Sequence, residues 1–139
     1  MARKNKIFQI EKKFAKNKMR KMKNLAPEIC RQRFLLEGFF EIAVDKKIIE
    51  KFFREIAAKL SLKIYSDPII FSPGGAGKKE NQGFDAFVPL VDSGISIYIW
   101  SDAKFLSLII YTCKKFDEKI ARDFTKKFFC CAKIESQSF

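Results

Sequence analysis

Every second residue of segment 94–100 is an isoleucine, and the residues between are glycine, polar or aromatic. A period of two is typical of a β-strand with one buried face. Apolar segments of similar length occupy residues 84–91 and 105–113, and the polar sequence SDAK, residues 101–104, fits a hairpin loop. The pattern therefore predicts three consecutive strands in the second half of the chain.

Two other segments have the three-and-four spacing of an amphipathic helix. In residues 46–60 the apolar residues mark one face, and Asp45 is a suitable N-cap. In residues 115–129 apolar residues recur at every fourth position: Phe116, Ile120, Phe124 and Phe128. We therefore predict one helix in each segment.

Three further strands complete the predicted fold. They are residues 33–44, with Gly38 as a candidate bulge, residues 62–71, where Pro68 indicates an edge or a bend, and the C-terminal residues 131–139. The resulting order, β-α-β-β-β-β-α-β, predicts an α+β two-layer sandwich in which both helices cover one face of an antiparallel sheet.

The 139 residues suit one folded domain, and the positive charge is concentrated before it. Residues 1–24 hold ten Lys or Arg and one Glu, and LAPE, residues 25–28, follows. We predict a basic N-terminal extension over 1–27 and a folded domain over 28–139. The extension is either a solvated tail or a nucleic-acid contact, and the missing aromatic or Gly/Arg pattern favours the tail.

The chain has neither an apolar run of membrane-spanning length nor a secretory signal, which predicts a cytoplasmic protein without a membrane partner. It has no histidine, and its four cysteines form no CxxC pair, so we expect no metal site and no imidazole-based catalysis. The glycine-rich loop 72–83 departs from the phosphate-loop pattern at Ser72 and Lys79, so we expect a flexible connection there.

The hairpin register leads to a specific chemical hypothesis. If SDAK closes a regular hairpin, Ser93 lies beside Thr112 and one step from Cys113. The Ser93 hydroxyl could then attack the carbonyl of Asp92, and elimination from the resulting ester would leave a pyruvoyl group. Such a group forms a Schiff base with an amine substrate and withdraws electrons as the carboxylate leaves. By residue type alone, Asp-Ser-Gly is an ordinary turn sequence, and residue type alone favours that interpretation.

The stretch DSGISIYIWSDAKFLSLIIYTC, residues 92–113, resembles the core of the small bacterial and archaeal S-adenosylmethionine decarboxylases. These pyruvoyl-dependent enzymes supply aminopropyl groups for spermidine. Their motif is Glu-Ser-His, then alternating residues to His-Thr-Trp-Pro-Glu, then a strand ending in Phe-Thr-Cys. The resemblance covers roughly residues 31–139 and is specific in 83–113. It implies the predicted sandwich, assembled as a homodimer.

The resemblance also implies roles for individual residues. Ser93 would become the pyruvoyl cofactor, Asp92 would end the first of the two chains, and Cys113 would donate a proton during decarboxylation. Trp100 matches the Trp of the motif, and Asp102 replaces a Glu that contacts the ribose of the substrate.

Three positions depart from the family. Tyr98 replaces the processing histidine, Asp85 replaces a serine that assists processing, and Gly94 replaces the histidine after the pyruvoyl serine. Tyr98 could still move a proton and Asp85 could act as a base, so both remain candidate catalytic residues.

Several functional alternatives stay open. The first expectation is decarboxylation of S-adenosylmethionine, and a changed pocket could accept another amino-acid substrate such as ornithine or arginine. A second possibility is an unprocessed, inactive relative that serves as a binding or regulatory subunit. A third, nucleic-acid binding, rests only on the basic extension.

Overall fold

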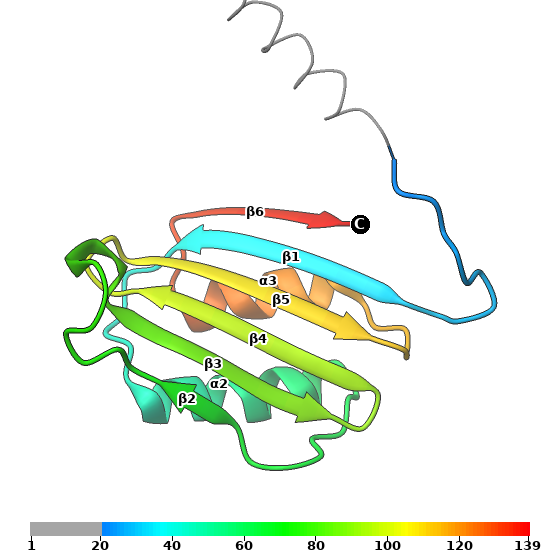
Figure 1. The fold of residues 1–139 in the computed structure, drawn as a ribbon, viewed down its shortest axis with the longest axis horizontal. Helices are drawn as coiled ribbons and strands as arrows, with labels where there is room; N and C mark the ends of the chain where they lie inside the picture. Colours follow the sequence, from blue (N-terminus) through cyan, green and yellow to red (C-terminus); the bar gives the residue numbers. More distant parts are fainter. Residues whose placement is uncertain (1–20) are drawn as a thin grey trace, which may run out of the picture.

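A computed structural model describes residues 21–139 of the chain, and its centre is one six-stranded antiparallel sheet (Figure 1). The strands lie in the order β2-β3-β4-β5-β1-β6. The elements are β1 (Gln32–Phe39), α2 (Lys46–Lys59), β2 (Ile69–Phe71), the 3₁₀ turn η1 (Lys79–Asn81), β3 (Gly83–Leu90), β4 (Ser93–Trp100), β5 (Phe105–Thr112), α3 (Glu118–Phe128) and β6 (Lys133–Ser138). Residues 1–20, which hold most of the predicted basic extension, lie outside the described residues.

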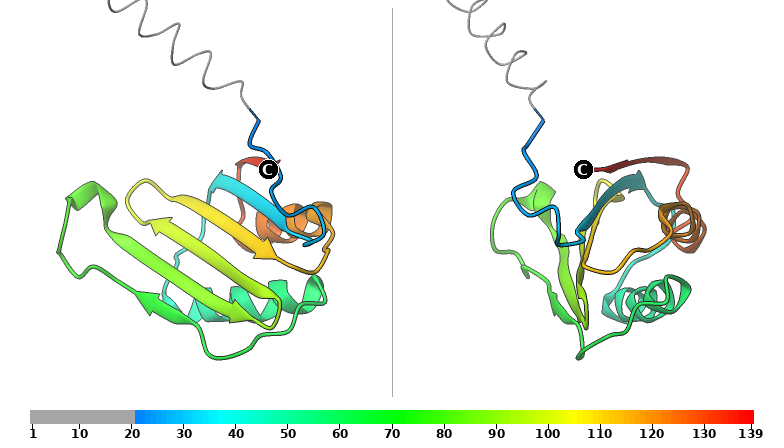
Figure 2. Two further views of the ribbon diagram at one scale, coloured as in Figure 1. Left: turned by 45° about the vertical axis from the view of Figure 1, so that its right-hand side comes forward. Right: turned by 90° about the vertical axis from the view of Figure 1, so that its right-hand side faces the viewer.

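Both helices cover the same face of the sheet, as the edge-on view in Figure 2 shows. The core lies between the two layers and includes the three alternating isoleucines of β4, each 3% exposed or less. Phe52 of α2 packs against Phe129, with ring centroids 4.8 Å apart, and links the helices. The predicted α+β two-layer sandwich is confirmed.

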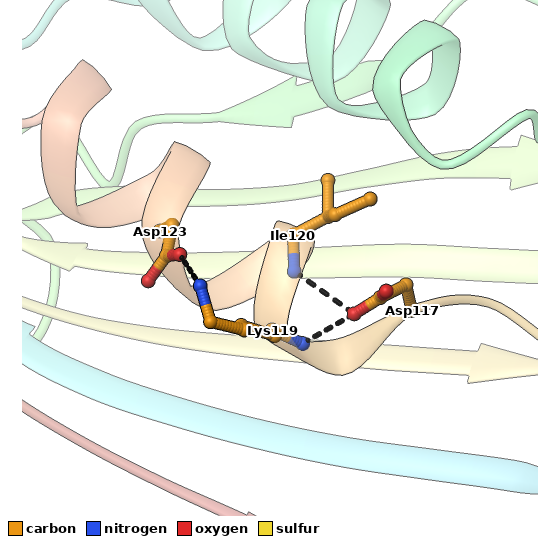
Figure 3. Close-up of polar contacts among 4 residues, drawn as sticks. All are labelled: Asp117, Lys119, Ile120 and Asp123. Atoms are coloured by element: carbon orange, nitrogen blue, oxygen red, sulfur yellow. Dashed lines mark hydrogen bonds and ion pairs between the residues drawn. The ribbon is translucent and has the colours of Figure 1, made fainter.

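Each helix begins at an aspartate that caps free backbone N–H groups. The Asp45 carboxylate accepts a hydrogen bond of 2.8 Å from the N–H of Ile48. The Asp117 carboxylate accepts bonds from Lys119 and Ile120 (Figure 3). Because Asp117 occupies the cap, α3 begins three residues later than residue 115, where the apolar spacing placed its start.

One exposed ion pair lies on α3. Lys119 Nζ and Asp123 Oδ2 are 2.8 Å apart, one helical turn from each other (Figure 3). Its hydrogen bond raises the pKa of Lys119 and lowers the pKa of Asp123. Because both groups are fully exposed, the pair adds little to stability.

The predicted register between β4 and β5 is confirmed at every position. Trp100 pairs with Phe105, Tyr98 with Ser107, and Ser93 with Thr112. The turn between β3 and β4 has the predicted length of two residues but lies one residue earlier, because only Val91 and Asp92 lie outside the strands and Ser93 is already the first residue of β4.

The predicted bulge at Gly38 is wrong. Gly38 pairs in register with Leu106 on one side and Ile134 on the other. A side chain there would place its Cβ 3.0 Å from the carbonyl oxygen of Lys133, so glycine is needed for close strand packing rather than for a bulge.

Two predicted strands are longer than the observed ones. β1 ends at Phe39 instead of residue 44, because the N–H of Glu41 bonds to the carbonyl oxygen of Phe129, outside the sheet, and the chain turns toward α2. β2 contains only Ile69–Phe71 of the predicted 62–71, and it lies at the sheet edge as Pro68 indicated. Apolar residues beyond both strands still pack on the core, which is why the pattern overextends them.

Candidate active site

Ser93 and Cys113 meet where β4 begins and β5 ends. Ser93 Oγ lies 3.5 Å from Cys113 Sγ, within hydrogen-bond reach for a thiol. Cys113 is exposed and Ser93 is half-buried, so a small molecule can reach both side chains from solvent. The hairpin register therefore places the predicted nucleophile and the predicted proton donor side by side.

The carbonyl group that Ser93 would attack accepts a hydrogen bond. The N–H of Cys113 donates a hydrogen bond of 2.8 Å to the carbonyl oxygen of Asp92. A donor in this position polarises the carbonyl and stabilises negative charge that develops on its oxygen, as the donors of an oxyanion hole do. The N–H of the preceding residue, Val91, bonds to the carbonyl oxygen of Lys63 and fixes the turn from its other side.

The backbone at Ser93 is strained. Its φ angle is +132°, in a region that side-chain-bearing residues rarely adopt. Strain of this kind costs about 1–3 kcal/mol and gathers at functional sites. Because the strain lies at the residue whose N-terminal peptide bond would be cleaved, breaking that bond would release it.

The glycine after Ser93 leaves room for an aromatic ring. A Cβ at Gly94 would lie 2.4 Å from Cε2 of Phe87, so the Phe87 ring occupies the space of a side chain at position 94. Phe87 itself is 42% exposed and therefore presents an apolar surface next to Ser93. Where the resemblance predicts a histidine in the family, this chain therefore has a glycine and the ring of a neighbouring strand.

Two hydrogen bonds hold the segment after β5 in place around Cys113. The buried hydroxyl of Thr112 donates to the carbonyl oxygen of Lys114 at 2.5 Å. Lys114 Nζ in turn donates to the carbonyl oxygen of Ser61, at the end of α2, at 3.0 Å. These bonds hold the residues on both sides of Cys113 and so limit the movement of its thiol.

Tyr98 and Asp85 form a second group, apart from Ser93. They are paired directly across β3 and β4, and both lie on the sheet face opposite the helices. Tyr98 is five residues along β4 from Ser93, which corresponds to about 16 Å in an extended strand. Within one protomer, the structure does not bring these two residues to Ser93.

Trp100 and Asp102 are farther still from Ser93. The indole N–H of Trp100, at the end of β4, donates to Asn81 Oδ1 at 3.3 Å, and its ring lies 5.3 Å from that of Phe105. Asp102 is exposed in the adjoining turn. Trp100 is seven residues from Ser93, or about 23 Å along the strand, so the predicted substrate-binding residues and the predicted cofactor lie at opposite ends of the hairpin.

Cys131 gives no second reactive thiol. Cys131 is buried, and burial raises its pKa to about 11, so its thiol stays protonated at neutral pH. Within residues 21–139, no group of three His, Cys, Asp or Glu side chains could hold a metal ion. In the same part of the chain, no helix combines the length and apolarity that membrane crossing requires.

Sequence reasoning missed three contributors to this site. The backbone N–H of Cys113 carries no side-chain signal, and the Phe87 ring reaches Gly94 only across the β3–β4 pairing. The Lys114 bond joins positions 53 residues apart in the chain. Only Phe87 could have been found earlier, because residue 87 is near position 94 in any tight hairpin between β3 and β4.

Comparison with known proteins identifies the family and a similar fold. The sequence pattern of the S-adenosylmethionine decarboxylase family matches residues 36–139. Among solved structures, the fold is similar to the crystal structure of the adenosylmethionine decarboxylase from Aquifex aeolicus VF5, with a TM-score of 0.62 and 19% sequence identity. The match covers 80% of this chain and 89% of the Aquifex chain. No curated protein sequence is significantly similar to this one.

Proposed function

The chain belongs to the S-adenosylmethionine decarboxylase family, and from this premise we propose that it cleaves itself between Asp92 and Ser93 and decarboxylates S-adenosylmethionine with the pyruvoyl group so formed. The observation that carries the proposal is the placement of Cys113, whose thiol lies 3.5 Å from Ser93 Oγ while its N–H bonds to the carbonyl oxygen of Asp92.

Self-cleavage would proceed from that placement in four steps: attack, bond breakage, elimination and hydrolysis. Ser93 Oγ attacks the carbonyl carbon of Asp92, and the negative charge on the carbonyl oxygen is stabilised by the Cys113 N–H. The C–N bond then breaks as the proton lost by the Ser93 hydroxyl passes to the freed amine nitrogen, and the Asp92 acyl group is left on the serine oxygen as an ester. Loss of the Ser93 α-proton then breaks the bond between Cβ and Oγ and expels the main-chain carboxylate of Asp92. The dehydroalanine that remains takes up water and releases ammonia, which leaves a pyruvoyl group at the new N-terminus.

The residues around Ser93 fit that group. A pyruvoyl group supplies an electrophilic ketone that binds the substrate amine and accepts electrons as carbon dioxide leaves. The Cys113 thiol would hold a proton within reach of the substrate carbon that loses its carboxylate. The exposed Phe87 ring would exclude water from one side of the substrate.

A homodimer would complete the site. The sheet face opposite the helices exposes large apolar residues on five of its strands or just beyond them: Phe39, Ile69, Phe71, Phe87, Tyr111 and Phe139. Such a patch is typical of an interaction surface. If two sheets pack face to face about a two-fold axis perpendicular to the strands, the Trp100 end of one hairpin lies over the Ser93 end of the other.

In that arrangement the partner subunit would supply Tyr98, Asp85, Trp100 and Asp102 to each Ser93. These residues of the partner subunit would then reach Ser93, from which Tyr98 and Trp100 of the same chain are about 16–23 Å away. Tyr98 would then move protons during cleavage with Asp85 as the base, and Trp100 and Asp102 would bind the substrate at the pyruvoyl group of the opposite subunit.

The compartment and the domain division belong to the same proposal. The described cysteines are all unpaired, three of them exposed, which is typical of a reducing compartment such as the cytoplasm. The catalytic domain would be residues 28–139, preceded by the basic extension 1–27. Spermidine synthesis is the pathway that this product would enter.

The test is carbon dioxide release from carboxyl-labelled substrates. We expect release from S-adenosylmethionine and none from ornithine, arginine or lysine. Release from ornithine or arginine alone would reject S-adenosylmethionine as the substrate and would still support pyruvoyl-dependent decarboxylation. One rival hypothesis is an unprocessed, inactive subunit, which the replacement of the family histidine by Tyr98 favours. An intact chain that releases carbon dioxide from none of the four compounds would support this rival.

A further inference from the structure

A groove runs between α2 and α3 on the side of the helix layer that faces away from the sheet. Its cavity volume is about 440 Å³, within the range of small-molecule sites. Three lysines line it, Lys51 and Lys59 from α2 and Lys127 from α3, with Glu55 as the single acid. The groove is therefore strongly biased toward negatively charged ligands.

The floor of the groove is aromatic and rigid. Phe124 and Phe128 of α3 are half-buried, so part of each ring faces the groove. Fully buried Phe52 supports both: its ring is stacked nearly parallel to Phe124, at 17° and 6.0 Å, and lies 5.2 Å from Phe128. The two rings are tilted by 42° to one another, so a planar ligand can stack on one of them while the other borders its edge.

The lysines of the groove have no acidic partner in the described part of the chain. Lys51, Glu55 and Lys59 have the spacing of helical ion pairs, yet the one salt bridge within residues 21–139 is Lys119–Asp123. Three ammonium groups around one cavity repel each other, and an anion that binds among them relieves that repulsion.

From this combination we propose that the groove binds a planar ring that carries several negative charges, the chemistry of a nucleoside triphosphate. The ring would stack on Phe124 with Phe128 at its edge, and the phosphates would lie among the three lysines. The basic extension and a second copy of this surface are both positively charged, so neither complements the groove. The site is separate from Ser93, and the inference does not depend on the proposed decarboxylase activity.

The experiment is titration calorimetry of the full chain with adenosine triphosphate, adenosine and inorganic tripolyphosphate. We expect saturable binding of adenosine triphosphate and clearly weaker binding of adenosine and of tripolyphosphate. Lys51→Gln, Lys59→Gln and Lys127→Gln should each weaken triphosphate binding by about two- to fivefold. The matched controls Lys46→Gln and Lys126→Gln, in the same helices but outside the groove, should leave it unchanged.

Three results would overturn the proposal. They are no saturable binding, equal affinity for tripolyphosphate and the nucleotide, and equal losses in groove and control variants. Because the nucleotide shares an adenosine group with S-adenosylmethionine, the titration is repeated with that compound in excess. Undiminished binding supports a separate groove site, and competitive displacement places the nucleotide at the active site and rejects the groove.

Discussion

The backbone N–H of Cys113 donates a hydrogen bond of 2.8 Å to the carbonyl oxygen of Asp92. The residue that directly follows β5 thus places a thiol beside Ser93 and a hydrogen-bond donor on the peptide bond that precedes Ser93. Because the donor is a backbone group, substitution of the Cys113 side chain leaves it in place, so the two contributions of this residue can be tested separately.

The purified protein should consist of two fragments, residues 1–92 and 93–139. The second fragment should be lighter, by the mass of one ammonia, than the same fragment with an N-terminal serine. Ser93→Ala should remain one intact chain because it lacks the attacking hydroxyl. Denaturing electrophoresis and mass spectrometry measure both, and a wild-type chain that stays intact under all conditions would contradict self-cleavage.

Ser93→Gly should be more stable than Ser93→Ala. Neither variant can be cleaved, but alanine keeps the strained φ of +132° and glycine adopts it readily. We expect the glycine variant to have a free energy of unfolding higher by about 1 kcal/mol, measured by urea denaturation. Equal stabilities, or a more stable alanine variant, would show that Ser93 is not strained.

Cys113→Ser should separate cleavage from decarboxylation. The backbone donor to Asp92 remains, so cleavage should continue at a similar rate. A hydroxyl is a much weaker acid than a thiol, so decarboxylation should fall by about 100-fold or more. Cys130→Ser, which changes an exposed cysteine in another part of the fold, is the control, and full activity of Cys113→Ser would exclude the thiol as proton donor.

If the site is shared between subunits, two variants that each lack a different residue of the site should restore cleavage when they form a mixed dimer. Tyr98→Phe alone should be cleaved about 100-fold more slowly. Co-expressed with Ser93→Ala, the Tyr98→Phe chain should be cleaved, because its Ser93 faces the intact Tyr98 of the partner subunit. Mass spectrometry identifies which chain is cut.

The control for this pairing is the double variant Ser93→Ala with Tyr98→Phe, which should restore nothing. Cleavage of Tyr98→Phe at the normal rate on its own would remove Tyr98 from the mechanism. Failure of restoration in a dimer shown to contain both chains would argue against the shared site.

Cys131 should make stability depend on alkaline pH. Burial raises its pKa from 9.0 to about 11 in the folded chain, so between these values the unfolded state loses the proton and the folded state keeps it. The free energy of unfolding therefore falls as pH rises from about 9 to 11, by about 1–2 kcal/mol. The stability difference between wild type and Cys131→Ala should shrink over this range, and a constant difference would contradict the assignment.

The sequence alone predicted the elements with regular periodicity and strong boundary residues. The alternating isoleucines of β4 and the cap Asp45 located their strand and helix within a residue or two, because burial on one face and capping are local requirements. The SDAK hairpin then determined the register, since a shift by one residue would turn the buried isoleucines toward solvent. That register alone placed Ser93 next to Cys113.

Tertiary structure decided what depends on long-range contacts. The end of β1 at Phe39, the unbulged Gly38 and the short β2 follow from which backbone groups find partners, and apolar spacing does not record this. The same holds for the φ angle of Ser93 and for the hydrogen bond from Cys113 to Asp92. Side-chain pattern determines which face of an element is buried, whereas backbone pairing and strain are determined by neighbours that are distant in sequence.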